Sequence, residues 1–453
     1  MKNLVVLIAV MVASAYAQSR TAVVYQGARL IVGDGSAAVE SGDFVVQNGR
    51  ITALGAKGAV KVPTGAARVD LTGKTVMPTM INVHVHIGYE GYTSWGAENY
   101  SAQNVLDHLQ REAFYGTGVT QSVGTSPTDS AIQFQKDQQA GKFPPAARFY
   151  FLPGMAPPGG GPDQVLRVAT TKLHTIYEVS TPEEARVAVR GMSAKGIKQL
   201  KMWVDDRGGT YPKLSPETFG AIIDEAHKHG MLVHTHATTL PDQKAVVRAG
   251  TDVLVHMVQG EKIDDELMGL LKEKKPYWAT VIGLGDPTAV CEKDPFFEQS
   301  MPDATIATIR ATTERKPLAP SCGPPSPRAP VREQILAYNF PRMISSGARI
   351  VLGTDTGIEP GHTFGSGDHL EIARWVNLGL TPAQAIVAAT SRPAELLGIS
   401  KESGTLAVSK RADFIVLDAN PLDDIHNTRK ISSVYLDGAK LDREALLVKF
   451  KKR

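Results

Sequence analysis

The feature that most constrains the fold is an alternation of apolar, strand-like runs with amphipathic helices over residues 76–395. One unit shows the pattern clearly: Ser215 can cap a helix, Gly230 can end it, and an apolar run leads from Met231 into His234. The apolar residues of this helix recur at i, i+3, i+4 and i+7 on one face: Phe219, Ile222, Ile223 and Ala226. Repeated units of this kind predict an α/β fold, a (β/α)8 barrel of the TIM type. A doubly wound open sheet is the alternative, but no glycine-rich phosphate loop supports it.

Both ends of the chain show a different residue pattern, which is typical of short β-strands. Near the N-terminus, Asn48-Gly49 lies between two apolar runs, which is the strongest short signal for a hairpin. Near the C-terminus, Ala412 to Leu417 reads as a strand, and Asp437-Gly438 suggests a second hairpin. We therefore expect residues 18–75 and 396–453 to build one small β-sandwich domain from both termini, beside a barrel formed by residues 76–395.

The first residues read as a secretory signal. Lys2 precedes an apolar run, and Ala15-Tyr16-Ala17 offers small residues for a signal peptidase, so residues 1–17 are expected to be removed before Gln18. The apolar run is too short to span a bilayer, which predicts a secreted or periplasmic protein without membrane insertion. The formal net charge is +3, from 49 basic and 46 acidic residues, which is too near neutral for a nucleic-acid-binding protein.

A proline-rich stretch, residues 283–331, reads as a long insertion on a βα loop and contains both cysteines, Cys291 and Cys322. In an oxidising compartment the two cysteines can pair, but their spacing alone does not fix the separation of their Cα atoms. The sequence therefore leaves open both the disulfide and the role of the insertion, for which a lid is one reading.

Metal-ligating side chains end several of the apolar runs. His84-Val85-His86 is the sharpest signal, because residues two apart on a strand point to the same side and can reach one metal ion. In chain order the ionisable residues at the ends of five runs are His84 with His86, Lys201, His234, His256 and Asp355. A parallel barrel places its active site at the carboxyl ends of its strands, so the series predicts one metal site there.

Together these segments resemble the amidohydrolase superfamily, in the binuclear, metal-dependent branch related to prolidase-type dipeptidases, N-acyl amino acid hydrolases and ochratoxin-degrading amidohydrolases. The resemblance covers nearly the whole chain after the signal segment. The segments that carry it are Met77-Pro78, His84-Val85-His86, Lys201 to Asp206, His234-Thr235-His236, Gly353-Thr354-Asp355, Ala388 to Thr390, Pro393 to Gly398 and Lys410 to Phe414.

The resemblance implies two divalent metal ions, expected to be Zn²⁺, bridged by Lys201 after its carboxylation by CO2. The implied metal ligands are His84, His86 and Asp355 for the first ion, His234 and His256 for the second, and Lys201 for both. Asp355 would also act as base and then as acid, and His236 would line the substrate pocket and polarise the scissile carbonyl. The reverse assignment of His234 and His236 remains open.

The implied activity is hydrolysis of an amide in N-acyl amino acids, Xaa-Pro-type dipeptides or ochratoxin-like amides, by a hydroxide that bridges the two metals. A lactonase or phosphotriesterase-like ester hydrolase is an alternative that uses the same chemistry. A cyclic-amide hydrolase or deaminase of the imidazolonepropionase type is disfavoured by Lys201, since those relatives typically use one metal. The expected partners are a small-molecule or dipeptide substrate and further copies of the chain in a homo-oligomer.

Other residues are assigned less specific places. Asn82 stands where the family usually has an aspartate, so it cannot serve as an anionic partner behind the metal ligands. His362 and His369 follow Asp355 in a glycine-rich segment, where substrate contact and exposure to solvent are equally open. The remaining histidines are expected on helix surfaces or in loops: His108, His227, His229 and His426.

Overall fold

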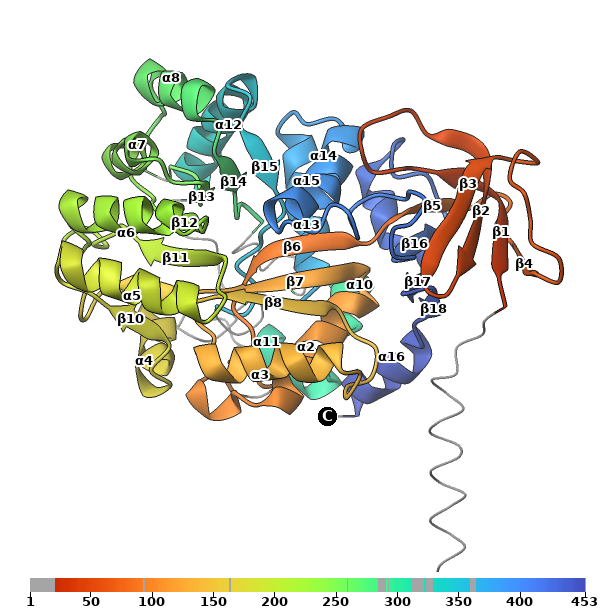
Figure 1. The fold of residues 1–453 in the computed structure, drawn as a ribbon, viewed down its shortest axis with the longest axis horizontal. Helices are drawn as coiled ribbons and strands as arrows, with labels where there is room; N and C mark the ends of the chain where they lie inside the picture. The colour runs from red at the N-terminus through yellow and green to blue at the C-terminus, as the bar shows by residue number, and fades with distance from the viewer. Residues whose placement is uncertain are drawn as a thin grey trace, which may run out of the picture.

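The computed structural model describes residues 21–92, 94–162, 164–258, 260–283, 291, 293–311, 322, 329–358 and 364–452. Figure 1 shows strands from both termini gathered at one end of the molecule, with alternating strands and helices making up the rest. The signal segment and His362 lie outside the described residues. Among the residues that are described, no helix is long and apolar enough to cross a membrane.

The middle of the chain forms parallel strands that pair in sequence order. One sheet joins β6 to β7 and β8, and a second joins β9 to β11, β12, β13, β14 and β15, with β10 on the outer side of β9. Their bounds are β6 Met80–Val85, β7 Thr117–Val123, β8 Arg148–Leu152, β9 Gly154–Ala156, β10 Ile176–Glu178, β11 Gln199–Trp203, β12 Leu232–His236, β13 Val253–Val255, β14 Tyr277–Ala279 and β15 Arg349–Val351. The parallel α/β organisation expected from the sequence is therefore present.

Backbone contacts connect the first and last of these strands. The Val83 amide donates to the carbonyl of Leu352 at 2.8 Å, and Val85 forms a parallel bridge with Thr356. Between β8 and β9 the chain is interrupted only at Pro153, whose carbonyl accepts from the Lys201 amide. The strand ends that carry the predicted metal ligands are thus neighbours in space.

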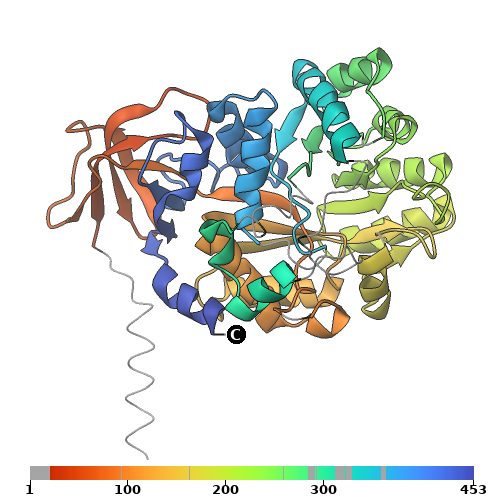
Figure 2. The ribbon, with the colours of Figure 1, turned by 180° about the vertical axis from the view of Figure 1, so that it is seen from behind.

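Helices follow the strands and pack their apolar faces inward. Helix α6 (Pro216–Lys228) begins as predicted, with the Ser215 hydroxyl accepting from the Thr218 amide, and buries the four expected apolar residues. The other helices of this region are α2 Ala102–Phe114, α3 Thr128–Gln139, α4 Gln164–Lys172, α5 Pro182–Ala194, α7 Leu240–Ala249, α8 Asp265–Lys274, α12 Ala329–Ser345, α13 Ser366–Asn377, α14 Pro382–Ala389 and α15 Ser391–Leu396. Figure 2 shows the same arrangement from behind.

The terminal strands form one sheet in the order β18-β17-β16-β5-β1-β2-β3, with β4 also pairing with β1. Their bounds are β1 Val23–Leu30, β2 Val39–Gln47, β3 Arg50–Ala56, β4 Ala67–Asp70, β5 Thr75–Pro78, β16 Phe414–Leu417, β17 Ile431–Leu436 and β18 Ala439–Lys440, and α16 (Arg443–Lys451) follows. Both predicted hairpins are confirmed. Gln47 pairs with Arg50 around Asn48-Gly49, and Leu436 pairs with Ala439 around Asp437-Gly438, with positive φ at all four turn residues.

Four aromatic rings join the N-terminal and C-terminal strands of this sheet. Tyr25 stacks on Phe44 with a centroid separation of 4.7 Å, and Phe414 stacks on Tyr435 at 4.4 Å. Edge-to-face contacts between the two pairs complete the cluster, the geometry that aromatic rings favour. Residues almost 400 positions apart in the sequence are therefore packed in one small core.

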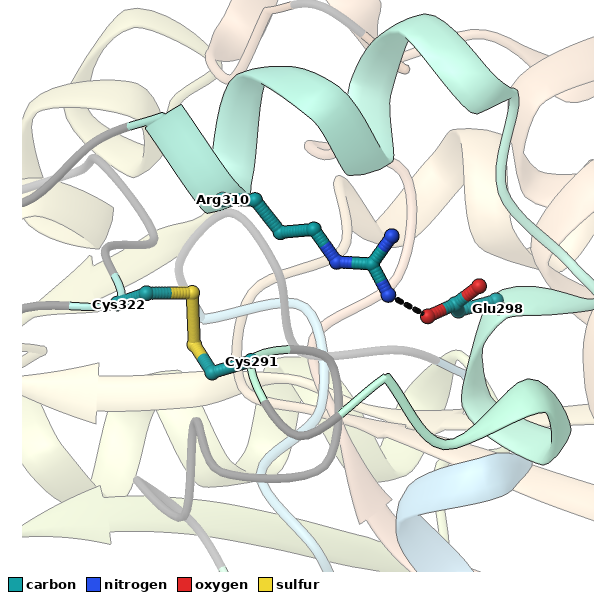
Figure 3. Close-up of a disulfide and its surroundings, with 4 residues drawn as sticks. All are labelled: Cys291, Glu298, Arg310 and Cys322. Carbon is teal, nitrogen blue, oxygen red and sulfur yellow. Dashed lines mark hydrogen bonds and ion pairs between the residues drawn. A yellow bond between two sulfur atoms is a disulfide. The ribbon is translucent and has the colours of Figure 1, made fainter.

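The proline-rich insertion lies between β14 and α12. Its described part contains two short helices, α10 (Pro295–Glu298) and α11 (Asp303–Ala311), and the ion pair between Arg310 and Glu298 joins them. Cys291 and Cys322 form a disulfide, which settles the question that the sequence left open. Figure 3 shows this disulfide beside the Arg310–Glu298 pair.

Removing this disulfide is expected to lower the thermal stability of the protein. Cys291 and Cys322 are 31 positions apart, so in the chain-entropy view their link stabilises the folded state by about 3–4 kcal/mol. For a chain of this length, that corresponds to a fall of about 4 °C in Tm. Scanning calorimetry of the Cys291→Ser, Cys322→Ser double variant would measure it; an unchanged Tm would show that the bond constrains the unfolded chain too little to matter.

Candidate metal centre and substrate cavity

A cavity of about 380 Å³ opens at the carboxyl ends of the parallel strands. A volume of this size is typical of small-molecule sites. Six of its lining residues come from the strand ends singled out in the sequence or from the motif next to them: His84, His86, Lys201, His236, His256 and Asp355. His234, which was expected to be a metal ligand, is not among the residues that line the cavity.

Three of these side chains already form a compact group of ligand atoms. Asp355 Oδ1 lies 2.7 Å from His86 Nε2 and 3.0 Å from His84 Nε2. The ligand atoms of the three residues all lie within 4.8 Å of one another, a grouping that can hold a metal ion. The other ring nitrogen of His86, Nδ1, lies 3.0 Å from the Thr125 hydroxyl, a contact that fixes the ring orientation.

His256 and Asp355 share an unusual backbone conformation. Their φ angles are 70° and 59°, in the left-handed region that residues with a side chain seldom adopt. His256 Nε2 lies 3.8 Å from Asp355 Oδ2, so this conformation turns the two side chains toward the same group. Strained residues of this kind cluster at functional sites, because the surrounding fold must hold them there.

Lys201 is almost completely buried on β11, with only 1% of its surface exposed. Burial lowers the pKa of its amine to about 7, so a large fraction is neutral at neutral pH. The packing leaves no room for a side chain at Gly124, where a Cβ would lie 3.1 Å from Lys201 Cγ and closer still to the Trp203 ring. Lys201 is therefore packed closely against Gly124, where a larger residue would not fit.

Burial keeps His84 and His256 in their neutral, metal-binding form. Burial lowers the pKa of His84 to about 3, with a further contribution from Lys201, and burial likewise holds the pKa of His256 well below its usual value. Burial opposes ionisation of Asp355, but His84 and His86 outweigh it and hold the pKa of Asp355 well below its normal range. Neutral imidazoles and an ionised carboxylate are the forms in which these groups bind a divalent cation.

The structure gives His234 and His236 different surroundings: Nδ1 of His234 is buried without a hydrogen-bond partner among the described residues, whereas His236 lines the cavity. His234 lies beneath the cavity, where its Nε2 is 3.0 Å from Gln199 Oε1. His236 lines the cavity, with its ring centroid 4.4 Å from that of His256. Its Nε2 is 2.9 Å from Asp205 Oδ2, and a carboxylate on one ring nitrogen is the usual partner of a histidine that binds a metal through the other.

Asp205 and Arg207 are functional candidates that the sequence did not single out. Arg207 forms an ion pair with Asp205, and its guanidinium lies 2.7 Å from Nε2 of His236, the same nitrogen that contacts Asp205. Burial and the nearby charge of Arg207 together lower the pKa of His236 to about 4. Asp205 lies within the segment from Lys201 to Asp206 that carries the family resemblance. The resemblance therefore indicated the position of Asp205 in the sequence but not its contact with His236.

Asn82 occupies the centre of a buried polar network behind His84. Its amide nitrogen donates to Asp368 Oδ1 at 2.7 Å and to the Thr354 hydroxyl at 2.8 Å, and its oxygen accepts from the His84 amide. The carboxylate that this position lacks is therefore supplied by Asp368 on α13. Burial raises the pKa of Asp368 to about 6, in contact with Glu112, whose pKa burial also raises.

An aspartate at position 82 is expected to destabilise this protein. Asn82→Asp would replace two donated hydrogen bonds by a carboxylate facing Asp368, at a cost of about 1–3 kcal/mol. Both carboxyls would have folded-state pKa values above those of the unfolded chain. The deficit against the unsubstituted protein should therefore be small near pH 4 and grow as the pH rises through 6. Melting curves between pH 4 and 8 test this; a deficit independent of pH contradicts it.

Other histidine predictions had mixed outcomes. The prediction that His108 is at the surface was wrong: it is fully buried in α2, where its Nδ1 accepts from the Gly88 amide. His369 is buried in α13, with Nε2 2.8 Å from the Tyr115 carbonyl, and does not line the cavity. His227 and His229 lie at the C-terminal end of α6, and His426 is exposed, as expected.

The donor set fits divalent metal ions. Among the described residues, Nδ1 of His84 and Nδ1 of His234 are buried and have no hydrogen-bond partner. Buried polar atoms without a partner are rare, because each costs free energy, and a coordinated cation would satisfy them. Histidine nitrogens with carboxylate oxygens are ligands that zinc and related ions prefer.

Comparisons with known proteins agree with this geometry. The sequence matches the Amidohydrolase family over residues 75–441. Ochratoxinase from Aspergillus niger is 26% identical over 250 residues, which is 54% of this chain but 45% of that protein. The chain therefore covers less than half the length of this relative, and the match shows kinship rather than a shared activity.

Two solved structures show the same fold along almost the whole chain. A Xaa-Pro dipeptidase with bound methionine has a TM-score of 0.70 at 22% identity, covering 93% of this chain and 100% of that one. Phenylurea hydrolase B has a TM-score of 0.74 at 21% identity, covering 94% and 98%. With the family match spanning most of the sequence and the ligand set gathered at one cavity, the chain belongs to the amidohydrolase family.

Proposed function

We propose that this protein is a binuclear metal-dependent hydrolase that cleaves an amide bond in N-acyl amino acids, Xaa-Pro-type dipeptides or ochratoxin-like amides. The observation that carries the proposal is the convergence of His84, His86, Lys201, His256 and Asp355 on one cavity. These residues come from the ends of four different strands, and no structural requirement of the fold brings five such side chains to one place.

The proposal includes the organisation of the chain. Residues 76–395 are taken to form a (β/α)8 barrel, residues 18–75 and 396–453 a composite β-sandwich, and residues 1–17 a signal peptide for export. The backbone link from the segment after β15 to β6 supports closure of the barrel. A homo-oligomer is part of the same proposal.

The residues for the two metal positions follow from the contacts. His84, His86 and Asp355 would hold one ion, His236 and His256 the other, and Lys201 as its carbamate would lie between them. When bound, such ions polarise a carbonyl and lower the pKa of a bound water to about 7. His236 replaces His234 in this set, because it lines the cavity and has a carboxylate, Asp205, behind it.

The protein's own groups perform the proton transfers. The neutral Lys201 amine can add to CO2, forming an N–C bond and losing one proton, which turns a poor ligand into an anionic one. Its pKa of about 7 makes that amine available at neutral pH. Asp355 accepts the proton of the attacking water and delivers it to the leaving nitrogen, and the low pKa of this carboxyl keeps it ionised at the start of the cycle.

A substrate screen tests this proposal. The protein is purified, loaded with Zn²⁺ in bicarbonate buffer, and assayed for release of free amino acid from N-acyl amino acids and Xaa-Pro dipeptides. Lactones, phosphotriesters and cyclic amides are included, and Asp355→Asn serves as the inactive control. Turnover confined to esters or to cyclic amides would overturn the amide assignment, and so would equal activity in the control.

A further inference from the structure

Two of the described residues that line the active-site cavity are arginines: Arg207, in the loop that follows β11, and Arg332, which comes from a helix. Arg332 is an exposed residue in the first turn of α12, the helix that follows the disulfide-linked insertion. The same side chain also lines a second, smaller hollow next to the cavity. Arg332 therefore stands at the boundary between the metal centre and this neighbouring space.

No ion pair or hydrogen bond joins Arg332 to a carboxylate of the residues that the structure describes. By contrast, the other guanidinium of the cavity, Arg207, is paired with Asp205, and the remaining carboxylate of the cavity lining, Asp355, faces the histidines. Among the described residues that line the cavity, Arg332 is therefore the guanidinium available to an anionic group of a bound molecule.

The smaller hollow beside Arg332 is apolar. Apart from Arg332 and Thr280, its lining consists of Met257, Val258, Val281, Ile282 and Leu336. Its volume of about 20 Å³ admits roughly one water-sized group, so it suits one methyl group at the tip of a short side chain. Val281 and Arg332 line both spaces, which makes the hollow a side pocket of the active-site cavity.

We propose that Arg332 binds the free carboxylate of the amino acid on the leaving side of the scissile amide, while the side pocket takes that residue's short apolar side chain. The inference rests on the proposed amide hydrolysis and narrows its substrate class to N-acyl or peptidyl derivatives of small apolar amino acids with a free carboxyl group. A guanidinium fits a carboxylate through two parallel hydrogen bonds, so it selects for charge and for geometry together. Arg332 is in this sense a specificity residue.

The test compares matched substrates that differ in one charge. N-acetyl-L-valine and N-acetyl-L-valinamide are assayed for release of acetate by the unsubstituted enzyme, by Arg332→Gln, and by Arg342→Gln. Arg342 is on the same helix, does not line the cavity and pairs with Asp265, so it is the control. We expect Arg332→Gln to lower kcat/KM for the free acid about ten- to hundredfold, mainly through KM, and to change that for the carboxamide less than about threefold.

The outcomes separate this inference from the proposed function. If Arg332→Gln affects both substrates equally, or neither, the carboxylate contact is wrong while amide hydrolysis stands. If the unsubstituted enzyme hydrolyses no amide, the proposed function fails, and calorimetric binding of N-acetyl-L-valine to the zinc-loaded protein still decides the contact, since binding must weaken in Arg332→Gln. Leu336→Ala should shift preference from N-acetyl-L-valine toward N-acetyl-L-phenylalanine, and an unchanged preference would place the side chain elsewhere.

Discussion

Replacement of Lys201 by alanine is expected to lower kcat/KM for every amide substrate at least about a thousandfold, equivalent to roughly 4 kcal/mol of transition-state stabilisation. The side chain is buried between the strand ends that carry the histidines, and alanine supplies no group that could lie between two cations. Metal content should fall below two ions per chain, because the ligand set would lose its only bridging member. Elemental analysis and steady-state kinetics on the same preparation measure both effects.

Lys198→Ala is the matched control, because Lys198 is exposed and lies just before the same strand. It should keep full activity and both ions. A second measurement separates a carbamate from a plain lysine. Metal reconstitution of the unsubstituted apoprotein should proceed further in bicarbonate buffer than in CO2-free buffer, and Lys201→Ala should lose that difference. Undiminished turnover in Lys201→Ala would remove the bridged site from consideration.

The arrangement of the strands was predictable because it follows from side-chain periodicity. Apolar runs that end in His84, His86 or Lys201 mark the carboxyl ends of parallel strands, and these ends meet at one face whatever the intervening helices contain. Turn chemistry was equally informative: Asn48-Gly49 needed positive φ at both positions and has it. Such signals are local, so a single sequence carries them.

Features that depend on long-range packing were not predictable. The sequence could not show that α13 brings Asp368 to Asn82. A carboxylate therefore lies next to position 82, although residue 82 itself is an asparagine. His108 lies on a helix, and other parts of the protein cover the side of the helix that carries it. The residues next to His108 in the sequence do not predict this burial. Arg332 follows the proline-rich insertion, and only the three-dimensional path of the chain returns it to the cavity.

The choice between His234 and His236 shows the same limit on a smaller scale. Both side chains lie on one face of β12, since they are two residues apart, and they differ only in depth by about 7 Å along the strand. The end of an apolar run does not reveal how far the cavity extends along the strands. The pairing of Trp203 with His236, and of Lys201 with His234, fixes that depth in the structure.

His236→Ala is therefore expected to be far more damaging to catalysis than His234→Ala. Loss of His236 should remove one metal ion per chain and lower kcat at least about a hundredfold, as expected for a group that binds a metal or touches the substrate. Loss of His234 should leave Gln199 without its partner and cost about 1–3 kcal/mol of stability, with both ions retained. Metal analysis, kcat and melting temperature on the two variants, prepared side by side, distinguish these patterns.

The opposite result with these two variants would reverse the roles of His234 and His236. If His234→Ala loses the metal and His236→Ala keeps it, His236 acts on the substrate, and the assignment implied by the family resemblance holds. Lys201, which pairs with His234, also lines the cavity, so this outcome would place the second ion at the level of Lys201. Asp205 gives an independent check: Asp205→Asn should weaken binding of one ion about ten- to a hundredfold if His236 is the ligand, since it removes the carboxylate that orients the ring.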